Sequence, residues 1–71
     1  MPESTYKIVE LVGTSVTSWE DAAKSAVEAA GKSLKDLRVA EVVKLDMTVE
    51  GGKVINFRTR VYLSFKYHPE D

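Results

Sequence analysis

The chain has 71 residues, of which 44% are hydrophobic and 30% are charged, a balance typical of a small folded domain. Ten basic and eleven acidic side chains give a net charge of −1, which argues against a broad basic surface for nucleic acid. No cysteine is present, so disulfides and thiolate metal sites are excluded. No apolar run approaches the ~20 residues of a membrane span and no signal-peptide pattern is found. We therefore expect one cytoplasmic domain over residues 1–71, ordered from about residue 5 to 67, without a membrane partner.

A strand and a helix are predicted in the first half of the chain. Tyr6–Val12 is rich in β-branched and apolar residues and ends at a Gly-Thr-Ser turn, which predicts a strand. Thr17-Ser18-Trp19-Glu20 fits a capping box, with Thr17 as the N-cap of a helix that runs to about Lys32. One face of that helix is apolar and nearly all alanine, so the helix should approach a sheet closely. Its members are Trp19, Ala22, Ala23, Ala26, Val27 and Ala30.

Two long strands are predicted in the second half, over Leu37–Val49 and Val54–Tyr67. Gly51-Gly52 between them is typical of a two-residue hairpin turn. The order β-α-β-β predicts an α+β fold, a three-stranded antiparallel sheet packed on one helix. A regular hairpin register places Val42 opposite Val61, Ala40 opposite Leu63 and Arg38 opposite Phe65.

This register predicts apolar side chains on both faces of the hairpin. The helix-facing set is Ala40, Val42, Phe57, Val61, Leu63 and Phe65, and the other face carries Leu37, Val39, Val43, Leu45, Met47 and Val49. A helix of ~15 residues spans about 22 Å, whereas a strand of ~13 residues spans about 43 Å. The helix therefore covers neither the full length nor the second face of the hairpin. An exposed apolar row is unusual for a monomer, so we expect the chain to associate with itself.

Several motifs in combination resemble one known family. They are Glu10-Leu11-Val12-Gly13-Thr14-Ser15, the Thr17-Ser18-Trp19-Glu20 cap with its alanine-rich helix, and Ala40-Glu41-Val42-Val43. The chain resembles the dodecins from about Tyr6 to Phe65. Dodecins are small β-α-β-β proteins that assemble as hollow shells of twelve subunits and commonly bind flavins. The resemblance therefore implies a hollow homododecamer whose main partner is itself.

The resemblance also indicates where a flavin would lie. Flavin-binding dodecins stack a tryptophan of the second strand on the flavin ring and use a glutamine of the third strand on the ring edge. The aligned residues here are Val39 and Arg58. Valine has no ring to stack, where stacking contributes about 1–3 kcal/mol by analogy with nucleic-acid bases. Arginine donates hydrogen bonds but does not accept them. The flavin site should be degraded, and a flavin alternative would rely on Tyr62 or a changed pose.

Other segments resemble a second branch, the calcium dodecins, which keep the shell but lack the stacking tryptophan. These segments are Asp36–Val43, Asp46-Met47 and Val61–Lys66. The resemblance makes calcium a candidate cofactor, with Asp46, Thr48 and Glu50 as candidate ligands because they alternate on one face near the hairpin tip. Calcium takes six to eight oxygens, so symmetry copies or backbone carbonyls must complete the shell. The alternative interpretation is a polar strand end that faces water.

The remaining candidates are structural. Glu41 should lie opposite Tyr62 and diagonal to Arg60, which favours a Glu41–Arg60 ion pair at a subunit interface. Trp19 opens the helix on its apolar face and should be a core or interface anchor. Arg58 and Arg60 are also candidates for a phosphate. His68, in the polar tail, should be an exposed residue.

We therefore expect a non-enzymatic, dodecin-like binding and storage protein. The first hypothesis is a calcium-type homododecamer with a degraded flavin site, and the alternative is a dodecin that sequesters riboflavin or FMN. An enzyme subunit is the third class. No second acid, nucleophile or histidine accompanies Glu41, so the sequence shows no group of catalytic residues that would support the enzyme hypothesis.

Overall fold

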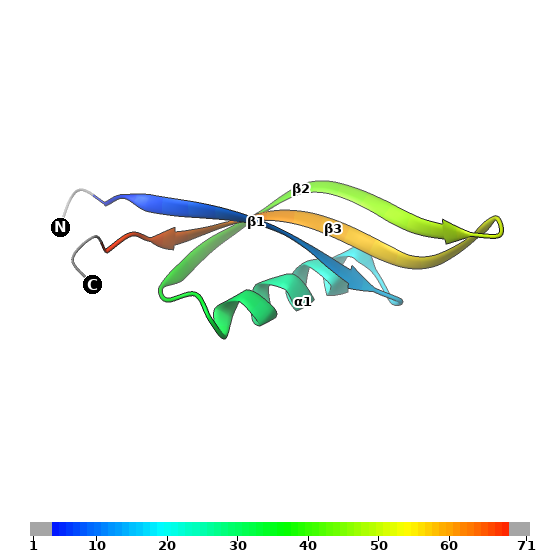
Figure 1. Cartoon of the computed structure of the whole chain (residues 1–71), viewed down its shortest axis with the longest axis horizontal. Helices are drawn as coiled ribbons and strands as arrows, with labels where there is room; N and C mark the ends of the chain where they lie inside the picture. The colour runs from blue at the N-terminus through cyan, green and yellow to red at the C-terminus, as the bar shows by residue number, and fades with distance from the viewer. Residues whose placement is uncertain (1–3, 69–71) are drawn as a thin grey trace.

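Three strands and one helix make up the fold. The computed structural model describes residues 4–68, with β1 (Tyr6–Ser15), α1 (Trp19–Gly31), β2 (Leu37–Glu50) and β3 (Lys53–Lys66) in chain order. The strands form one antiparallel sheet in the order β1-β3-β2, so β3 is central and pairs with both others (Figure 1). The helix lies along one face of this sheet. The predicted α+β architecture is confirmed.

The sheet is much longer than its helix. The molecule measures 52 × 20 × 15 Å along its principal axes, whereas a helix of 13 residues is about 20 Å long. In Figure 1 the hairpin of β2 and β3 continues well beyond the first turn of α1. One helix therefore covers only the middle of one face. Among residues 4–68, no helix has the length and apolarity that crossing a membrane requires.

The helix packs against the sheet through alanines. Ala22, Ala26 and Ala30 are buried, and they form a core with Val61 and Leu63 of β3. Gly13 of β1 faces the same stripe. A Cβ atom at that position would lie 2.0 Å from the carbonyl oxygen of Ala22 and 2.9 Å from the Cβ of Ala26. The alanine face therefore allows the close approach that its composition predicts, and Gly13 is part of that contact.

The helix begins one residue later than predicted. Ser18, not Thr17, is the N-cap, and its hydroxyl accepts a 3.0 Å hydrogen bond from the backbone N–H of Asp21. The Thr17 amide donates to the Ser15 hydroxyl at 2.9 Å, so it does not need the Glu20 carboxylate. Ser15 in turn donates to the Asp21 carboxylate at 2.7 Å. The predicted capping box is wrong because the end of β1 supplies these partners instead.

The hairpin register is interrupted. Val42 pairs with Val61 and Ala40 with Leu63, as predicted. Register shifts occur between Leu37 and Val39, between Val42 and Lys44, and between Thr48 and Val49. As a result Leu37, not Arg38, lies opposite Phe65. The first two shifts each add one residue to β2, which reverses the alternation of its side chains beyond that point, whereas the third adds Ile55 to β3.

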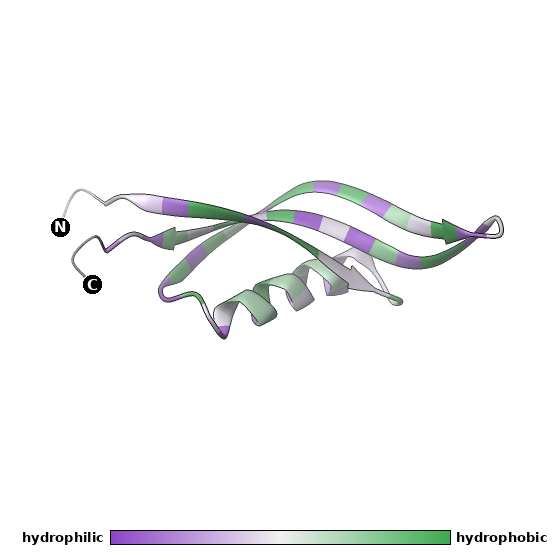
Figure 2. Ribbon diagram, viewed as in Figure 1, coloured by the Kyte–Doolittle hydropathy of each residue, from purple (hydrophilic) through white to green (hydrophobic). Residues whose placement is uncertain are grey.

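These shifts correct the predicted apolar row. Leu45 and Met47 lie opposite Thr59 and Phe57, on the helix side of the sheet and not on the uncovered face. Leu37 also packs against the core beside α1. Val39 stays on the uncovered face, whereas Val49 follows Thr48 directly and points to the other side of the sheet. Hydrophilic and hydrophobic residues alternate along β3 (Figure 2), as expected for a strand whose two faces have different surroundings.

The Gly13 contact yields a first prediction. Gly13→Ala should lower the free energy of unfolding by about 1–3 kcal/mol, because the new methyl group overlaps the backbone of α1. Gly31→Ala is the matched control, since a Cβ at Gly31 meets nothing within 4 Å. Denaturant unfolding at one fixed protein concentration measures both variants. Equal stability of Gly13→Ala and the unmodified protein would contradict the close helix contact.

Candidate functional site

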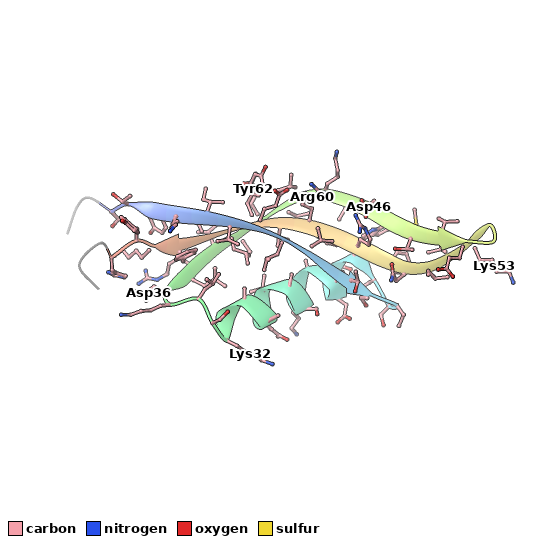
Figure 3. All side chains as sticks on the ribbon, in the orientation of Figure 1. Lys32, Asp36, Asp46, Lys53, Arg60 and Tyr62 are labelled. Carbon is pink, nitrogen blue, oxygen red and sulfur yellow. The ribbon has the colours of Figure 1, made fainter. Side chains whose placement is uncertain are left out.

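The face of the sheet opposite α1 carries most of the predicted site residues. Along β3 it presents alternate residues, with partners from β1 on one side and β2 on the other. The β3 members are Asn56, Arg58, Arg60, Tyr62 and Ser64; β1 adds Thr14, Val12, Glu10 and Ile8, and β2 adds Thr48, Asp46, Lys44, Glu41 and Val39. Figure 3 shows the labelled Tyr62, Arg60 and Asp46 on this side of the sheet. Charged groups gather in the middle of the face.

Arg58 and Asp46 form a two-pronged ion pair across β3 and β2. The Nε atom donates to Oδ1 at 2.7 Å and the Nη2 atom to Oδ2 at 3.3 Å. The Arg58 hydrogen bond lowers the pKa of the Asp46 carboxyl, and the charges of Arg58, Arg60 and Lys44 lower it further. The same hydrogen bond raises the pKa of Arg58. Both oxygens of Asp46 are therefore already engaged by a cation.

Arg60 pairs with β1 rather than with β2. Its Nη1 atom donates to Glu10 Oε2 at 3.1 Å. Within the protomer Arg60 does not pair with Glu41, although Glu41 does lie opposite Tyr62, and an ion pair of Glu41 at a subunit interface stays a prediction. Because β3 is central, β1 pairs with its other edge and places Glu10 opposite Tyr62, diagonal to Arg60. The Nε atom of Arg60 is buried and has no hydrogen-bond partner within residues 4–68.

Trp19 attaches the start of α1 to the hairpin. Its Nε1 atom donates to the backbone carbonyl of Asp46 at 2.9 Å. Its own carbonyl accepts from the buried Thr59 hydroxyl at 2.8 Å. The indole ring meets Phe57 edge-on, with ring centres 4.9 Å apart. Trp19 is thus an anchor within the protomer, and it fixes the backbone at Asp46.

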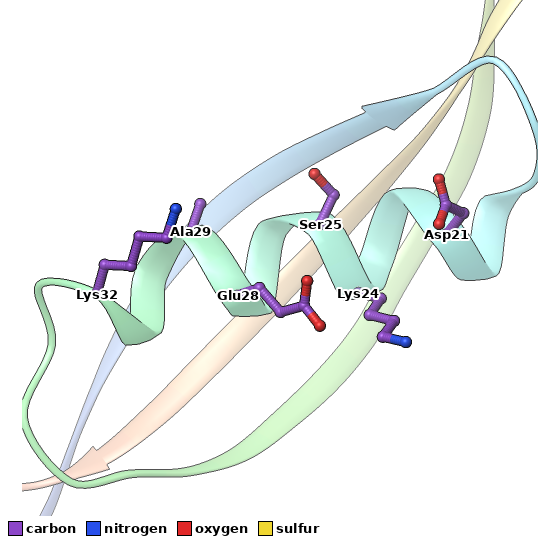
Figure 4. A pocket seen from close by; sticks show the side chains of 6 residues that line it. All are labelled: Asp21, Lys24, Ser25, Glu28, Ala29 and Lys32. Carbon is purple, nitrogen blue, oxygen red and sulfur yellow. The ribbon is translucent and has the colours of Figure 1, made fainter.

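Two hollows lie beside the helix. One, of about 350 Å³, is apolar and is lined by Trp19, Glu20, Ala23, Val42, Leu45 and Thr59. The other, of about 450 Å³, is the furrow between two rows of side chains on the outer helix face, where Asp21 and Glu28 balance Lys24 and Lys32 (Figure 4). This larger furrow is open and polar, so we assign it no binding role. The apolar hollow lies where a further hydrophobic surface could pack.

The predicted flavin positions share a face but do not meet within one protomer. Val39 is 55% exposed and lies opposite Ser64. Arg58 is six residues from Ser64 along β3, which separates it from Val39 by about 20 Å. Tyr62 lies between them on the same face. One protomer therefore supplies no shared pocket for this pair.

The predicted calcium ligands alternate along the end of β2. Asp46 and Thr48 lie on the uncovered face, opposite Arg58 and Asn56. The shift after Thr48 adds Ile55 to β3 and leaves the alternation of β2 unbroken, so Glu50, opposite Lys53, keeps the face of Asp46 and Thr48. Within residues 4–68 no three histidine or acidic side chains gather as a metal site. This donor set does not fit calcium in one protomer, because calcium takes six to eight oxygens and Arg58 already occupies Asp46.

Sequence reasoning missed a cluster around Asp36. Its Oδ2 atom lies 2.6 Å from His68 Nε2, and its Oδ1 atom lies 3.6 Å from Arg38. The hydrogen bond with His68 is the main cause of the lowered pKa of Asp36. Asp36 has a positive φ of 60° and its carbonyl accepts from the Lys66 amide. His68 is therefore held by a residue 32 positions earlier, a pairing that no local pattern indicates.

The ion pair of Asp46 predicts a pH dependence. The folded-state pKa of Asp46 lies below its ordinary value of 3.8. Its contribution to stability is therefore present above that pH and is lost as the pH falls through the lowered pKa. The stability difference between the unmodified protein and Asp46→Asn should be constant above about pH 5 and shrink below about pH 4.

Unfolding curves at several pH values measure this difference. The control compares Arg58→Gln with the double variant that carries both Arg58→Gln and Asp46→Asn. The stability difference between these two proteins should depend on pH much more weakly. A dependence of equal size without Arg58 would show that this guanidinium is not its cause.

Comparisons with known proteins find relatives that match nearly the whole chain. The family model described as Dodecin matches residues 5–68. The calcium dodecin of Mycobacterium tuberculosis is 46% identical over 66 residues, which are 93% of each chain.

Solved structures give the same result. The dodecin of Streptomyces coelicolor superimposes with a TM-score of 0.89 at 30% identity, covering 99% of this chain and 100% of its own. The M. tuberculosis calcium dodecin, described as calcium-chelating with a novel calcium-binding site, gives a TM-score of 0.81 at 45% identity, covering 96% and 97%. The extent of these matches, over the same β-α-β-β fold, shows that the chain belongs to the dodecin family.

Proposed function

We propose that this protein is a non-enzymatic storage protein that assembles as a hollow homododecamer and binds calcium. The observation that carries the proposal is the 46% identity to a calcium dodecin over 93% of both chains. We further propose that residues 1–71 act as one domain, which the family match over residues 5–68 supports.

The exposed apolar surface supports assembly. Large hydrophobic side chains stay exposed on all three strands, among them Ile8, Val12, Val39, Val42, Leu45, Met47, Val49, Val54 and Ile55. Such an extent of apolar surface is unusual on a monomer and typical of a subunit interface. Trp19, Glu41 and Arg60 are the residues we propose for contacts between copies. Glu41 is exposed and makes no ion pair within the described part of the chain, so a second copy can supply its partner.

Calcium is favoured over flavin by the residues at the flavin positions. Val39 offers no aromatic ring, and Arg58 is held against Asp46. Oxygens for calcium would come from more than one copy, with Asp46, Thr48 and Glu50 as candidates. On the uncovered face Arg58 pairs with Asp46 and Arg60 with Glu10.

Calorimetry tests the calcium function. Protein freed of metal with a chelator should give saturable heat on addition of calcium chloride, and EDTA should reverse it. Magnesium should give less heat, because it requires a small octahedral site and releases its waters reluctantly. Riboflavin fluorescence should stay unquenched by micromolar protein. Absence of calcium heat would contradict the proposal, and strong riboflavin quenching would favour the flavin alternative.

A flavin-binding dodecin is the second candidate, because the family match is general and Tyr62 is exposed beside the flavin positions. Val39→Trp should raise riboflavin affinity about tenfold, since stacking on an aromatic ring contributes about 1–3 kcal/mol. Adding Arg58→Gln should raise the affinity further, because an amide both donates and accepts. Fluorescence quenching measures both variants.

Val49→Trp is the control for the added ring, because Val49 is exposed but lies near the hairpin tip, away from the flavin positions. Equal gains from Val49→Trp and Val39→Trp would show non-specific stacking. No gain from Val39→Trp with Arg58→Gln would mean that the position no longer forms a flavin site.

A further inference from the structure

A further hollow, of about 220 Å³, lies at the end of the sheet where β1 begins and β3 ends. There Lys7 of β1 and Leu37 of β2 both pair with Phe65 of β3, and because Leu37 packs against the core beside α1, this row of side chains is on the helix side. The start of β1 and the end of β3 extend beyond the end of α1 (Figure 1). We call this cavity the end hollow, and it is lined by Lys7, Lys35, Phe65, Lys66, Tyr67 and His68.

The lining of the end hollow is basic and aromatic. Among residues 4–68, no acidic side chain contributes to it. The carboxylate of Asp36, outside the lining, contacts His68 at 2.6 Å and Arg38 at 3.6 Å. The ammonium group of Lys7 lies 6.0 Å from the centre of the Tyr67 ring and makes no ion pair within the described part of the chain. The end hollow therefore places a cation beside aromatic rings without an acid in its own lining.

Backbone hydrogen bonds hold the walls of the end hollow in place. The Tyr67 amide donates to the carbonyl of Thr5 at 2.8 Å, and the Lys66 amide donates to the carbonyl of Asp36 at 3.0 Å. These two bonds tie the end of β3 to the residues that precede β1 and β2. The backbone that carries the rings is thus fixed before any ligand arrives, which lowers the ordering cost of binding.

We propose that the end hollow binds a small organic anion that carries one aromatic ring, such as benzoate. The ring of the ligand packs against Phe65 and Tyr67, and its acidic group pairs with Lys7. A volume of about 220 Å³ is below the roughly 300–1,000 Å³ of pockets for drug-sized ligands, so the end hollow suits a single ring better than the larger ring system of a flavin.

This site differs from the sites proposed above in both place and ligand. It lies on the helix side of the sheet, whereas Val39 and the Asp46–Arg58 ion pair lie on the uncovered face. A lysine ammonium is a compact point charge, so it pairs with a carboxylate or with a phosphate. The aromatic ring and the negative charge are the features that the end hollow recognises, and the experiment compares both kinds of acidic group.

Titrations of the full-length protein, followed by ligand-observed NMR, test this site. Benzoate or phenyl phosphate should bind, and the one that binds more tightly identifies the preferred acidic group. Acetate and inorganic phosphate carry the charge without the ring, and benzyl alcohol carries the ring without the charge. Each of these three probes should bind about tenfold more weakly than the better aromatic anion, because each lacks one of the two contacts.

Lys7→Ala should weaken binding of the aromatic anion about tenfold, whereas Lys7→Arg should retain most of the affinity because it keeps the charge. Tyr67→Leu should also weaken binding, and Tyr67→Phe should not, because it keeps the ring. Lys53→Ala is the matched control, since Lys53 is an exposed lysine at the hairpin tip, far from Asp36 at the other end of the sheet (Figure 3). Native mass spectrometry checks that each variant keeps its subunit number.

Three results would overturn the proposal. The first is that neither aromatic anion binds at concentrations up to about 10 mM. The second is that benzyl alcohol, acetate or inorganic phosphate binds as tightly as the better aromatic anion, because the ring and the charge would then not act together. The third is an equal effect of Lys7→Ala and Lys53→Ala, which would place the ligand elsewhere. None of these results bears on calcium binding, so the two functions fail independently.

Discussion

One helix of 13 residues packs against a hairpin of two 14-residue strands, which is much longer because each strand residue is more extended. This difference in length determines how much of the sheet the helix leaves uncovered. The strands extend about 46 Å and the helix about 20 Å. The core that results is small, with Ala22, Ala26, Ala30, Val61 and Leu63 as its buried apolar members among residues 4–68. A domain of this size is marginal alone, and the proposed assembly would bury the exposed apolar side chains against other copies.

The central position of β3 explains the charged face. Its two arginines each take an acid from a different neighbour, Arg58 from β2 and Arg60 from β1. Exposed pairs of this kind contribute little to stability in water. Their effect grows where a second surface excludes water, because a broken pair then leaves a buried charge. The Arg58 pair also holds both oxygens of Asp46.

The sequence allowed the element order, the hairpin and the alanine face to be predicted because each depends on local chemistry. Gly51 and Gly52 have the positive φ angles of a tight hairpin turn, 57° and 76°. The register shifts along β2 leave no local signature, so the face of Leu45 and Met47 could not be predicted. The partner of Arg60 depends on β1 pairing with β3, which connects residues about fifty positions apart.

The central claim is that the folded protomer is incomplete until copies close around it. Native mass spectrometry at low micromolar concentration tests this most directly, because it reports subunit number and retained ligand together. The expected result is a single species of about 95 kDa, twelve copies of a 7.9 kDa chain. A stable, folded particle of 7.9 kDa in dilute solution would contradict it.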